Sequence, residues 1–253
     1  MKIIKNKLLQ YNNISHGFTT RKNGFSDNPF SSLNCSNFVG DHNKNVLKNR
    51  KLILKKLSLS SSLFVKQIHS NRVLKSENIM YSNEILEADA LTSMTPGLGI
   101  FVTVADCAPI LFADINIKMV AVAHAGWRGA VKGITDNVIT EFLNHGSKPR
   151  DISVVIGPCI GPSSYEVGID MKSQSIKLDP SADLFFHTLP NSKKSMFDLP
   201  GYLIKKMKSK GVEKICWTGE DTYKEPEKFF SYRYSKIFHD GLTGRMIGAI
   251  GLK

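Results

Sequence analysis

The stretch LGIFVTVADCAPILFADI, residues 98–115, contains two apolar runs separated by a polar break at Asp106 and Cys107. Each run has the length and the β-branched and aromatic content of a strand, so the stretch predicts strand, interruption, strand. The next run, KMVAVAHAGWRG at 118–129, predicts a third strand that carries His124 and ends in a turn at two glycines. If these strands are adjacent and end at the same edge of a sheet, Cys107 and His124 come together.

Helices and strands are mixed along the rest of the chain. Segment 16–40 is punctuated by glycine and proline and predicts loops. Elsewhere we expect helices at 43–57, 130–143 and 195–209, and strands at 62–69, 151–156, 214–219 and 245–252, the first of which ends at His69. Because these elements do not follow strict βαβ alternation, they favour an α+β fold with mixed sheets over a doubly wound parallel sheet.

The chain has 253 residues and a formal net charge of +12. Lysine is more frequent than arginine, and the sequence has neither a dense basic block nor the basic–aromatic interleaving of single-strand binders. This pattern argues against a nucleic-acid partner and indicates a solvated lysine surface. Such a surface would still draw anionic small molecules toward a cleft.

No apolar run has the length to span a bilayer, so we expect no membrane partner. The N-terminus, MKIIKNKLLQYNN, lacks the continuous apolar stretch and the cleavage site of a signal peptide, and we expect a cytoplasmic location. The four cysteines are Cys35, Cys107, Cys159 and Cys216. In a chain of this length they are expected to be free thiols, with Cys107 as the functional one.

His69, Cys107 and His124 each stand beside a break in an apolar run. One thiolate and two imidazoles are three ligands for zinc, and three protein ligands leave a fourth position open, as in catalytic zinc sites. Their spacing matches no short metal-binding signature, and a histidine at a strand end is often a hydrogen-bonded structural residue. The sequence therefore offers both interpretations of these residues.

Two neighbouring features allow two interpretations each. GWRG at 126–129, which contains Arg128, could bind an anion through backbone amides at a helix start, or could be a tight turn. Asp106 could orient a metal ligand or cap a strand end. Arg50 follows GDHNKNV within the first predicted helix, and arginine suits bidentate contact with phosphate.

A series of motifs in chain order resembles the YfiH family, also called the polyphenol oxidase or laccase-domain family and, more recently, a purine nucleoside phosphorylase family with peptidoglycan-editing members. The resemblance covers nearly the whole chain, so we expect one YfiH-type domain over 1–253. The motifs are HGFTTRKNG at 16–24, GDHNKNVLKNR at 40–50, KQIHS at 66–70, EADALTS at 87–93, TVADCAPILF at 103–112, AHAGWRGAVKGI at 123–134, IGPCIGPSSYEVG at 156–168, FFSYR at 229–233 and LTGR at 242–245.

The resemblance implies a four-layer α/β/β/α sandwich similar to the catalytic domain of the cytotoxic necrotizing factor toxins. It implies zinc-dependent phosphorolysis of adenosine, inosine and methylthioadenosine, with adenosine deamination as a second activity. The partners would be a small-molecule nucleoside and phosphate. The family's metal ligands fall on His69, Cys107 and His124. Cys107, His124 and Asp106 would be catalytic, and Arg50, Arg128 and Gln67 would contact substrate. Where the family usually has Arg-Arg, this chain has Arg233-Tyr234, which could alter a substrate or phosphate contact.

The laccase name can be tested on the histidines. Multicopper oxidases resemble one another in repeated His-x-His pairs, and the seven histidines of this chain include no such pair. One site of two histidines and a cysteine has too few ligands for a multicopper cluster, so we discount copper oxidase chemistry, although adventitious copper binding is easy at such a site. The H-x-E signature of zinc deaminases is also missing, because Ala125 and Gly126 follow His124.

Alternative functions stay open at this stage. A Cys–His hydrolase or deamidase would use Cys107 as nucleophile and His124 as its base. Editing of peptidoglycan precursors would use the same site on a different substrate. A non-enzymatic basic module would bind nucleic acid and show a steep dependence on salt.

Overall fold

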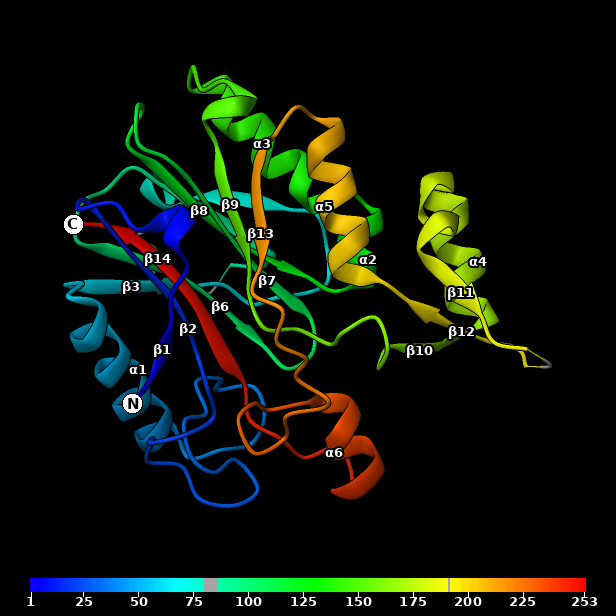
Figure 1. Ribbon diagram of the computed structural model, residues 1–253. Helices are drawn as coiled ribbons and strands as arrows, with labels where there is room; N and C mark the ends of the chain where they lie inside the picture. Colours follow the sequence, from blue (N-terminus) through cyan, green and yellow to red (C-terminus); the bar gives the residue numbers. More distant parts are fainter. Residues whose placement is uncertain (80–85, 191) are drawn as a thin grey trace.

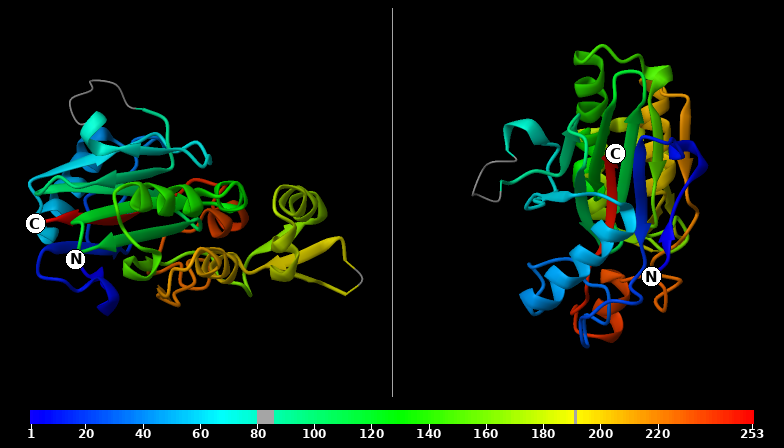
Figure 2. Two further views of the ribbon diagram at one scale, coloured as in Figure 1. Left: turned by 90° about the horizontal axis from the view of Figure 1, so that it is seen from above. Right: turned by 90° about the vertical axis from the view of Figure 1, so that its left-hand side faces the viewer.

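Two mixed β-sheets lie face to face, and helices cover the outer face of each (Figure 1). The computed structural model describes residues 1–79, 86–190 and 192–253. The layers are therefore helix, sheet, sheet and helix, and the expected four-layer α/β/β/α sandwich of the α+β class is confirmed. Figure 2 shows the layers from two further sides.

The six-stranded sheet has the order β13-β9-β7-β8-β5-β4. Its centre is antiparallel, and the outer pairs β13·β9 and β4·β5 are parallel. The strands are β4 (Val73–Lys75), β5 (Ala90–Ser93), β7 (Ala108–Asp114), β8 (Met119–Ala125), β9 (Ser153–Ile156) and β13 (Lys214–Trp217).

The five-stranded sheet has the order β1-β2-β14-β6-β3 and is antiparallel except for the pair β3·β6. β6 and β7, the two strands of the opening stretch, thus belong to different sheets, and the residues between them cross from one sheet to the other. The strands are β1 (Ile3–Ile4), β2 (Ile14–Thr19), β3 (Ser61–Phe64), β6 (Leu98–Val104) and β14 (Met246–Leu252).

Alternation along the strands fills the core on both faces of each sheet. Leu111 and Val122 of the six-stranded sheet pack against Ile100 and Ile250 of the five-stranded sheet in the space between them. The intervening residues, such as Phe112, point to the opposite face, toward helices. Because both faces are buried, β7, β8 and β14 are continuous apolar runs rather than alternating ones.

Helices close the two outer faces. α1 (Asn43–Leu57) covers the five-stranded sheet, while α2 (Trp127–Val131), α3 (Ile134–Asn144) and α5 (Leu199–Ser209) cover the six-stranded sheet. A small antiparallel sheet projects from this body together with α4, and α6 lies at the end of the sheets near it (Figure 1). These elements are β10 (Glu166–Gly168), α4 (Ile169–Leu178), β11 (Phe186–Thr188), β12 (Lys194–Phe197) and α6 (Tyr232–Phe238). Short 3-10 helices occupy Lys7–Leu9, Ser76–Asn78, Pro149–Asp151 and Pro180–Phe185.

Several predicted elements need correction. The strand expected to end at His69 ends at Phe64. The helix expected at 130–143 is two helices, because Gly133 adopts a left-handed φ of 85° between them. The helix expected from 195 begins at Leu199, where Asp198 caps it by accepting the Gly201 amide hydrogen at 2.8 Å, and the residues before it form β12. The segment predicted as loops begins inside strand β2.

Candidate metal centre and its two cavities

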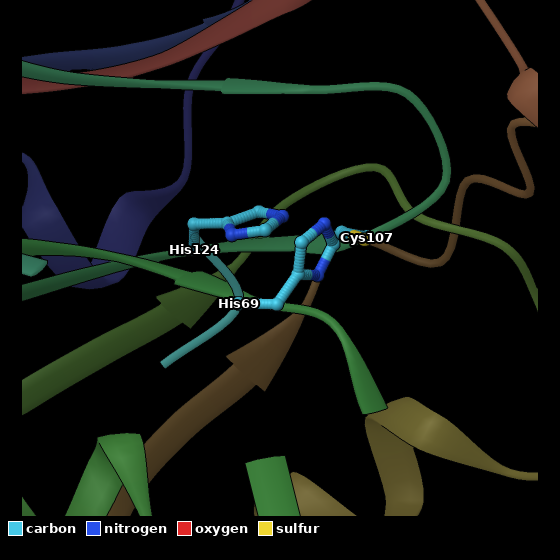
Figure 3. Close-up of side chains that lie close together, drawn as sticks. All are labelled: His69, Cys107 and His124. Atoms are coloured by element: carbon cyan, nitrogen blue, oxygen red, sulfur yellow. The ribbon is translucent and has the colours of Figure 1, made fainter. Parts of the chain in front are cut away.

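His69, Cys107 and His124 come together at one edge of the sheets. Their donor atoms all lie within 4.8 Å of one another. Figure 3 shows the two imidazoles beside Cys107, each from a separate segment of the chain. The imidazole rings meet edge to face, with centroids 4.8 Å apart. The structure thus brings together the three residues that the sequence singled out.

Cys107 lies in the three-residue connection between β6 and β7. The residue before it, Asp106, has a left-handed φ of 83°, a conformation that costs free energy in a non-glycine residue. Its buried carboxylate accepts hydrogen bonds from Thr222 Oγ1 at 2.6 Å and from the Arg233 amide at 2.7 Å. Asp106 therefore holds the turn that presents Cys107, and none of these hydrogen bonds reaches a candidate ligand. The arrangement agrees with the strand-end alternative for Asp106.

His69 lies in a loop, five residues beyond the end of β3, and also has a left-handed φ, of 57°. The Asp89 carboxylate accepts hydrogen bonds from the His69 amide at 3.0 Å and from the Ser70 amide at 2.6 Å. Gln67, two residues earlier, bonds through its side chain to the amide and carbonyl of Thr103 in β6. The loop is therefore attached to both sheets, which sets the position of His69.

His124 is buried in β8, with 4% of its surface exposed. Its Nδ1 lies 2.9 Å from Asp89 Oδ1, so Nε2 is the nitrogen left to bind a metal. Burial disfavours the charged imidazole, but the charge of Cys107 and the hydrogen bond with Asp89 outweigh it and raise the pKa of His124 to about 9. Burial would raise the pKa of Asp89, yet the hydrogen bonds from His124 and Ser70 lower it. Asp89 thus carries the negative charge that orients His124.

Gly126 supplies the space between the ligands. A Cβ at this position would lie 2.8 Å from His69 Nδ1 and 3.0 Å from Cys107 Sγ. Its φ of −75° is open to any residue, so this glycine is required by the close approach of the two ligands and not by its backbone conformation. Any larger residue would occupy the volume where the donor atoms converge.

The donor set fits zinc. Ligand atoms around a tetrahedral zinc ion lie about 3.3–3.7 Å apart, given Zn–N and Zn–S bonds of about 2.0 and 2.3 Å. The three donor atoms lie within 4.8 Å of one another, a separation that side-chain rotations can shorten to this spacing. With an Asp89 carboxylate behind His124, the group has the carboxylate–histidine arrangement that commonly supports a metal ligand.

Two cavities adjoin the cluster and share Ala105, Cys107 and Tyr232 in their walls. The larger, of about 600 Å³, contains all three candidate ligands. Arg128 and Arg245 also line it, and none of the described residues in its lining is acidic. The smaller, of about 210 Å³, has a mostly apolar surface, with Arg233 and Lys236 among its lining residues. Cys107 therefore stands at the junction of a basic and an apolar compartment.

The remaining candidates for substrate contact differ in position. Arg128 lines the larger cavity, with its guanidinium 4.4 Å from the Trp127 ring. Gln67 lines it too, but its side chain is already bonded to Thr103. Arg50 lines neither cavity: its guanidinium packs 3.8 Å from the centre of the Phe64 ring, and its Nε donates to Cys35 O at 2.9 Å. The structure does not bring Arg50 to the three candidate metal ligands.

Sequence reasoning missed three residues at the centre. Asp89 and Arg245 lie in the EADALTS and LTGR motifs, so the motif series contained the signal but assigned no role. Tyr165, in the smaller cavity, lies in the IGPCIGPSSYEVG motif. Tyr234, the residue that departs from the family pattern, lines neither of these two cavities.

A family model described as multi-copper polyphenol oxidoreductase laccase matches residues 15–253. The purine nucleoside phosphorylase of Haemophilus influenzae is 36% identical over 238 residues, which cover 93% of each chain. The purine nucleoside phosphorylase YfiH of Escherichia coli is 35% identical over 235 residues, which cover 92% of each. The chain belongs to the YfiH family.

Solved structures of the YfiH family share the whole architecture. A Neisseria meningitidis protein described as DUF152 aligns with a TM-score of 0.88 and 31% identity, covering 100% of this chain and 98% of that one. YlmD from Geobacillus stearothermophilus aligns with a TM-score of 0.86 and 28% identity, covering 98% and 94%. The YfiH membership predicted from the motifs is confirmed. Among the described residues, no helix combines the length and the apolar character needed to cross a membrane.

Proposed function

We propose that this chain is a zinc-dependent purine nucleoside phosphorylase that acts on adenosine, inosine and methylthioadenosine, with adenosine deamination as a second activity. The observation that carries the proposal is the cluster of His69, Cys107 and His124 at the wall of a basic cavity. The names of the relatives from Haemophilus influenzae and Escherichia coli support the reaction class.

Phosphorolysis replaces the ribosyl C–N bond by a C–O bond to phosphate, and the purine leaves with a proton. Positive charge develops on the sugar and negative charge on the departing base, so groups that stabilise either charge lower the barrier. A zinc ion bound by the three ligands would act as a Lewis acid or activate a water molecule. The protein's own groups would bind the reactants on either side of Cys107.

Arg128 and Arg245 are the proposed phosphate-binding residues. Arg128 is exposed at the cavity wall, and its guanidinium forms a cation–π contact with Trp127 that limits its range of positions. Arg245 donates to the carbonyls of Thr243 and Gly244 at 2.9 and 3.0 Å and lies 5.9 Å from the centre of the Tyr232 ring. One guanidinium group can donate hydrogen bonds to two phosphate oxygens at once. The larger cavity contains two such groups and no acidic residue in its described lining, so it favours an anionic second substrate. Arg245 replaces Arg50 in this role.

The decisive experiment measures phosphate-dependent release of free base from adenosine, inosine and methylthioadenosine. Wild type and Cys107→Ala should be compared, with Cys216→Ala as a control that loses a thiol outside both cavities. We expect base release in wild type and Cys216→Ala and a loss of at least about a hundredfold in Cys107→Ala. Ammonia release from adenosine without phosphate measures the deaminase activity.

Metal content should be determined on the same samples. We expect about one zinc per chain in wild type, and loss of activity after chelation that is restored by Zn²⁺ and not by Cu²⁺. Full activity in protein shown to be metal-free would contradict the zinc-dependent form of the proposal. Restoration by copper together with oxidation of a polyphenol would favour the laccase name instead.

A Cys–His hydrolase or deamidase is the second candidate, and one observation favours it. The Asp89 carboxylate orients His124, and His124 lies beside Cys107, so His124 could serve as the base for a Cys107 nucleophile. Such an arrangement needs no metal. His69 favours the metal site, because a third ligand has no part in a Cys–His pair. Rapid alkylation of Cys107 and a covalent acyl adduct, found by mass spectrometry in zinc-free protein, would favour the hydrolase.

A further inference from the structure

The smaller cavity differs from the larger in chemical character. It has a volume of about 210 Å³, whereas cavities that enclose a whole drug-sized ligand measure about 300–1,000 Å³. This volume has room for one planar ring system. Besides Gly126 and the turn Ala105–Cys107, its lining consists of two aromatic, two aliphatic and two basic side chains: Tyr165, Tyr232, Ile160, Leu199, Arg233 and Lys236.

Tyr165 lines this cavity, and its hydroxyl has no hydrogen-bond partner among the described residues. Its ring is held 5.9 Å from the Phe197 ring and 5.7 Å from the Arg233 guanidinium, and Arg233 is itself attached to Glu166 O at 2.7 Å. Within the ranges 1–79, 86–190 and 192–253, its hydroxyl makes no hydrogen bond to the protein. Burial raises the pKa of Tyr165, so the hydroxyl keeps its proton. A fixed, protonated and unpaired hydroxyl can bind a ligand inside the cavity.

Charge separates the two compartments further. In the smaller cavity the Asp106 carboxylate offsets part of the positive charge of Arg233 and Lys236, whereas the described lining of the larger cavity has Lys66, Arg128 and Arg245 and no acidic residue. The aromatic-lined compartment therefore suits a base, and the basic compartment suits phosphate. Aromatic walls favour a flat base through stacking or edge contacts.

We propose that the smaller cavity is the subsite for the purine base, with the Tyr165 hydroxyl hydrogen-bonded to the base, and that phosphate enters through the larger cavity. This inference rests on the proposed phosphorolysis. The bond to be cleaved then lies at the junction beside Cys107, with the departing base on one side and the attacking phosphate on the other. Tyr165 is a specificity residue that contacts the base.

The test separates base binding from phosphate binding in the zinc-loaded protein. Tyr165→Phe removes only a hydroxyl that has no partner among the described residues, so thermal denaturation should match wild type. We expect the KM for inosine and the inhibition constant of free hypoxanthine to rise about three- to tenfold, with the KM for phosphate unchanged. Arg128→Gln should do the reverse and raise the KM for phosphate about tenfold. Tyr223→Phe, outside both cavities, is the matched control and should change neither constant.

Each outcome bears on the inference. If wild type is active and Tyr165→Phe leaves both nucleoside and base constants unchanged, the subsite assignment fails and the proposed function stands. If Tyr165→Phe instead weakens phosphate, the two cavities have the opposite roles. If wild type shows no phosphorolysis, calorimetric titration with free adenine tests the base subsite by itself. Adenine binding that Tyr165→Phe weakens would support the base subsite and contradict the proposed reaction. Absence of adenine binding would overturn both the subsite and the proposed reaction.

Discussion

The Asp89 carboxylate lies 2.9 Å from Nδ1 of His124, and both groups are buried. The same oxygen of Asp89 accepts the amide hydrogen of His69 at 3.0 Å. One carboxylate therefore orients one candidate ligand through its ring and a second through its backbone. We infer that Asp89 organises the candidate metal centre without being one of its ligands.

Asp89→Asn should weaken zinc binding by about ten- to a hundredfold. The amide removes the charge that keeps His124 oriented, and its N–H groups would face the donors of His69 and Ser70. Competition with a chromogenic chelator measures the affinity. Glu87→Gln is the matched control, because it removes a carboxylate two residues away that pairs with Lys66 at the surface. Equal zinc affinity in Asp89→Asn and Glu87→Gln would refute the role of Asp89.

Gly126→Ala should abolish tight zinc binding with little loss of stability. Its new Cβ would lie 2.8 Å from His69 Nδ1, whereas the fold requires no glycine at a φ of −75°. Gly168→Ala is the matched control: Gly168 also precedes a helix and has a φ of −76°, and a Cβ added there would meet no atom within 4 Å. We expect both variants to unfold within about 1 kcal/mol of wild type. Retention of zinc by Gly126→Ala at wild-type affinity would show that the ligands converge elsewhere.

Asn49→Ala should destabilise the protein by about 2–4 kcal/mol. Asn49 is fully buried in α1, accepts the Phe25 amide hydrogen at 2.8 Å and donates to Ser26 Oγ at 3.0 Å and to Asn34 O at 2.6 Å. Its loss would leave several buried polar groups without partners. Urea unfolding measures the change, with exposed Asn43→Ala expected within about 0.5 kcal/mol of wild type. A similar effect of the two substitutions would contradict this account.

His16 should make the protein less stable in mild acid. Burial and the charge of Lys5 lower the pKa of His16 from 6.5 to about 4. Between these values the unfolded chain binds a proton that the folded chain excludes, so stability is full above pH 6.5 and declines as the pH falls to 4, by about 3 kcal/mol in total. His16→Gln keeps an acceptor for the Asn6 amide and should flatten this decline in urea unfolding at about pH 7.5, 5.5 and 4.5. If the free energy of unfolding of His16→Gln declines with falling pH as steeply as that of exposed His187→Gln, His16 is not the cause of the decline.

Local pattern was sufficient for much of the fold. The helix predicted at 43–57 has the bounds of α1, and the predicted interruption between two strands is the β6–β7 connection that carries Cys107. Apolar periodicity and a polar break act over a few residues, so they are visible without knowing which segments meet. Composition alone could not indicate that β6 and β7 belong to different sheets.

The three candidate ligands were named from the sequence, by their residue types and by the motif series around them. The residues that support these ligands could not be named from the sequence, because their roles depend on contacts between segments far apart in the chain. Asp89 lies against His124, and Gly126 leaves space beside His69 because it has no Cβ. For the same reason, Arg50 was an equal candidate for phosphate until packing against Phe64 placed it outside both cavities.

Sequence by itself therefore determined the layered α+β fold, the family and the identity of the candidate ligands, because each is encoded in local pattern or in motifs. Only the tertiary structure decided that Asp89 lies against His124, that Arg245 and not Arg50 lines the larger cavity, and that Cys107 lines both cavities. These relationships arise where two sheets and their connecting loops meet, and no short stretch of the chain contains them.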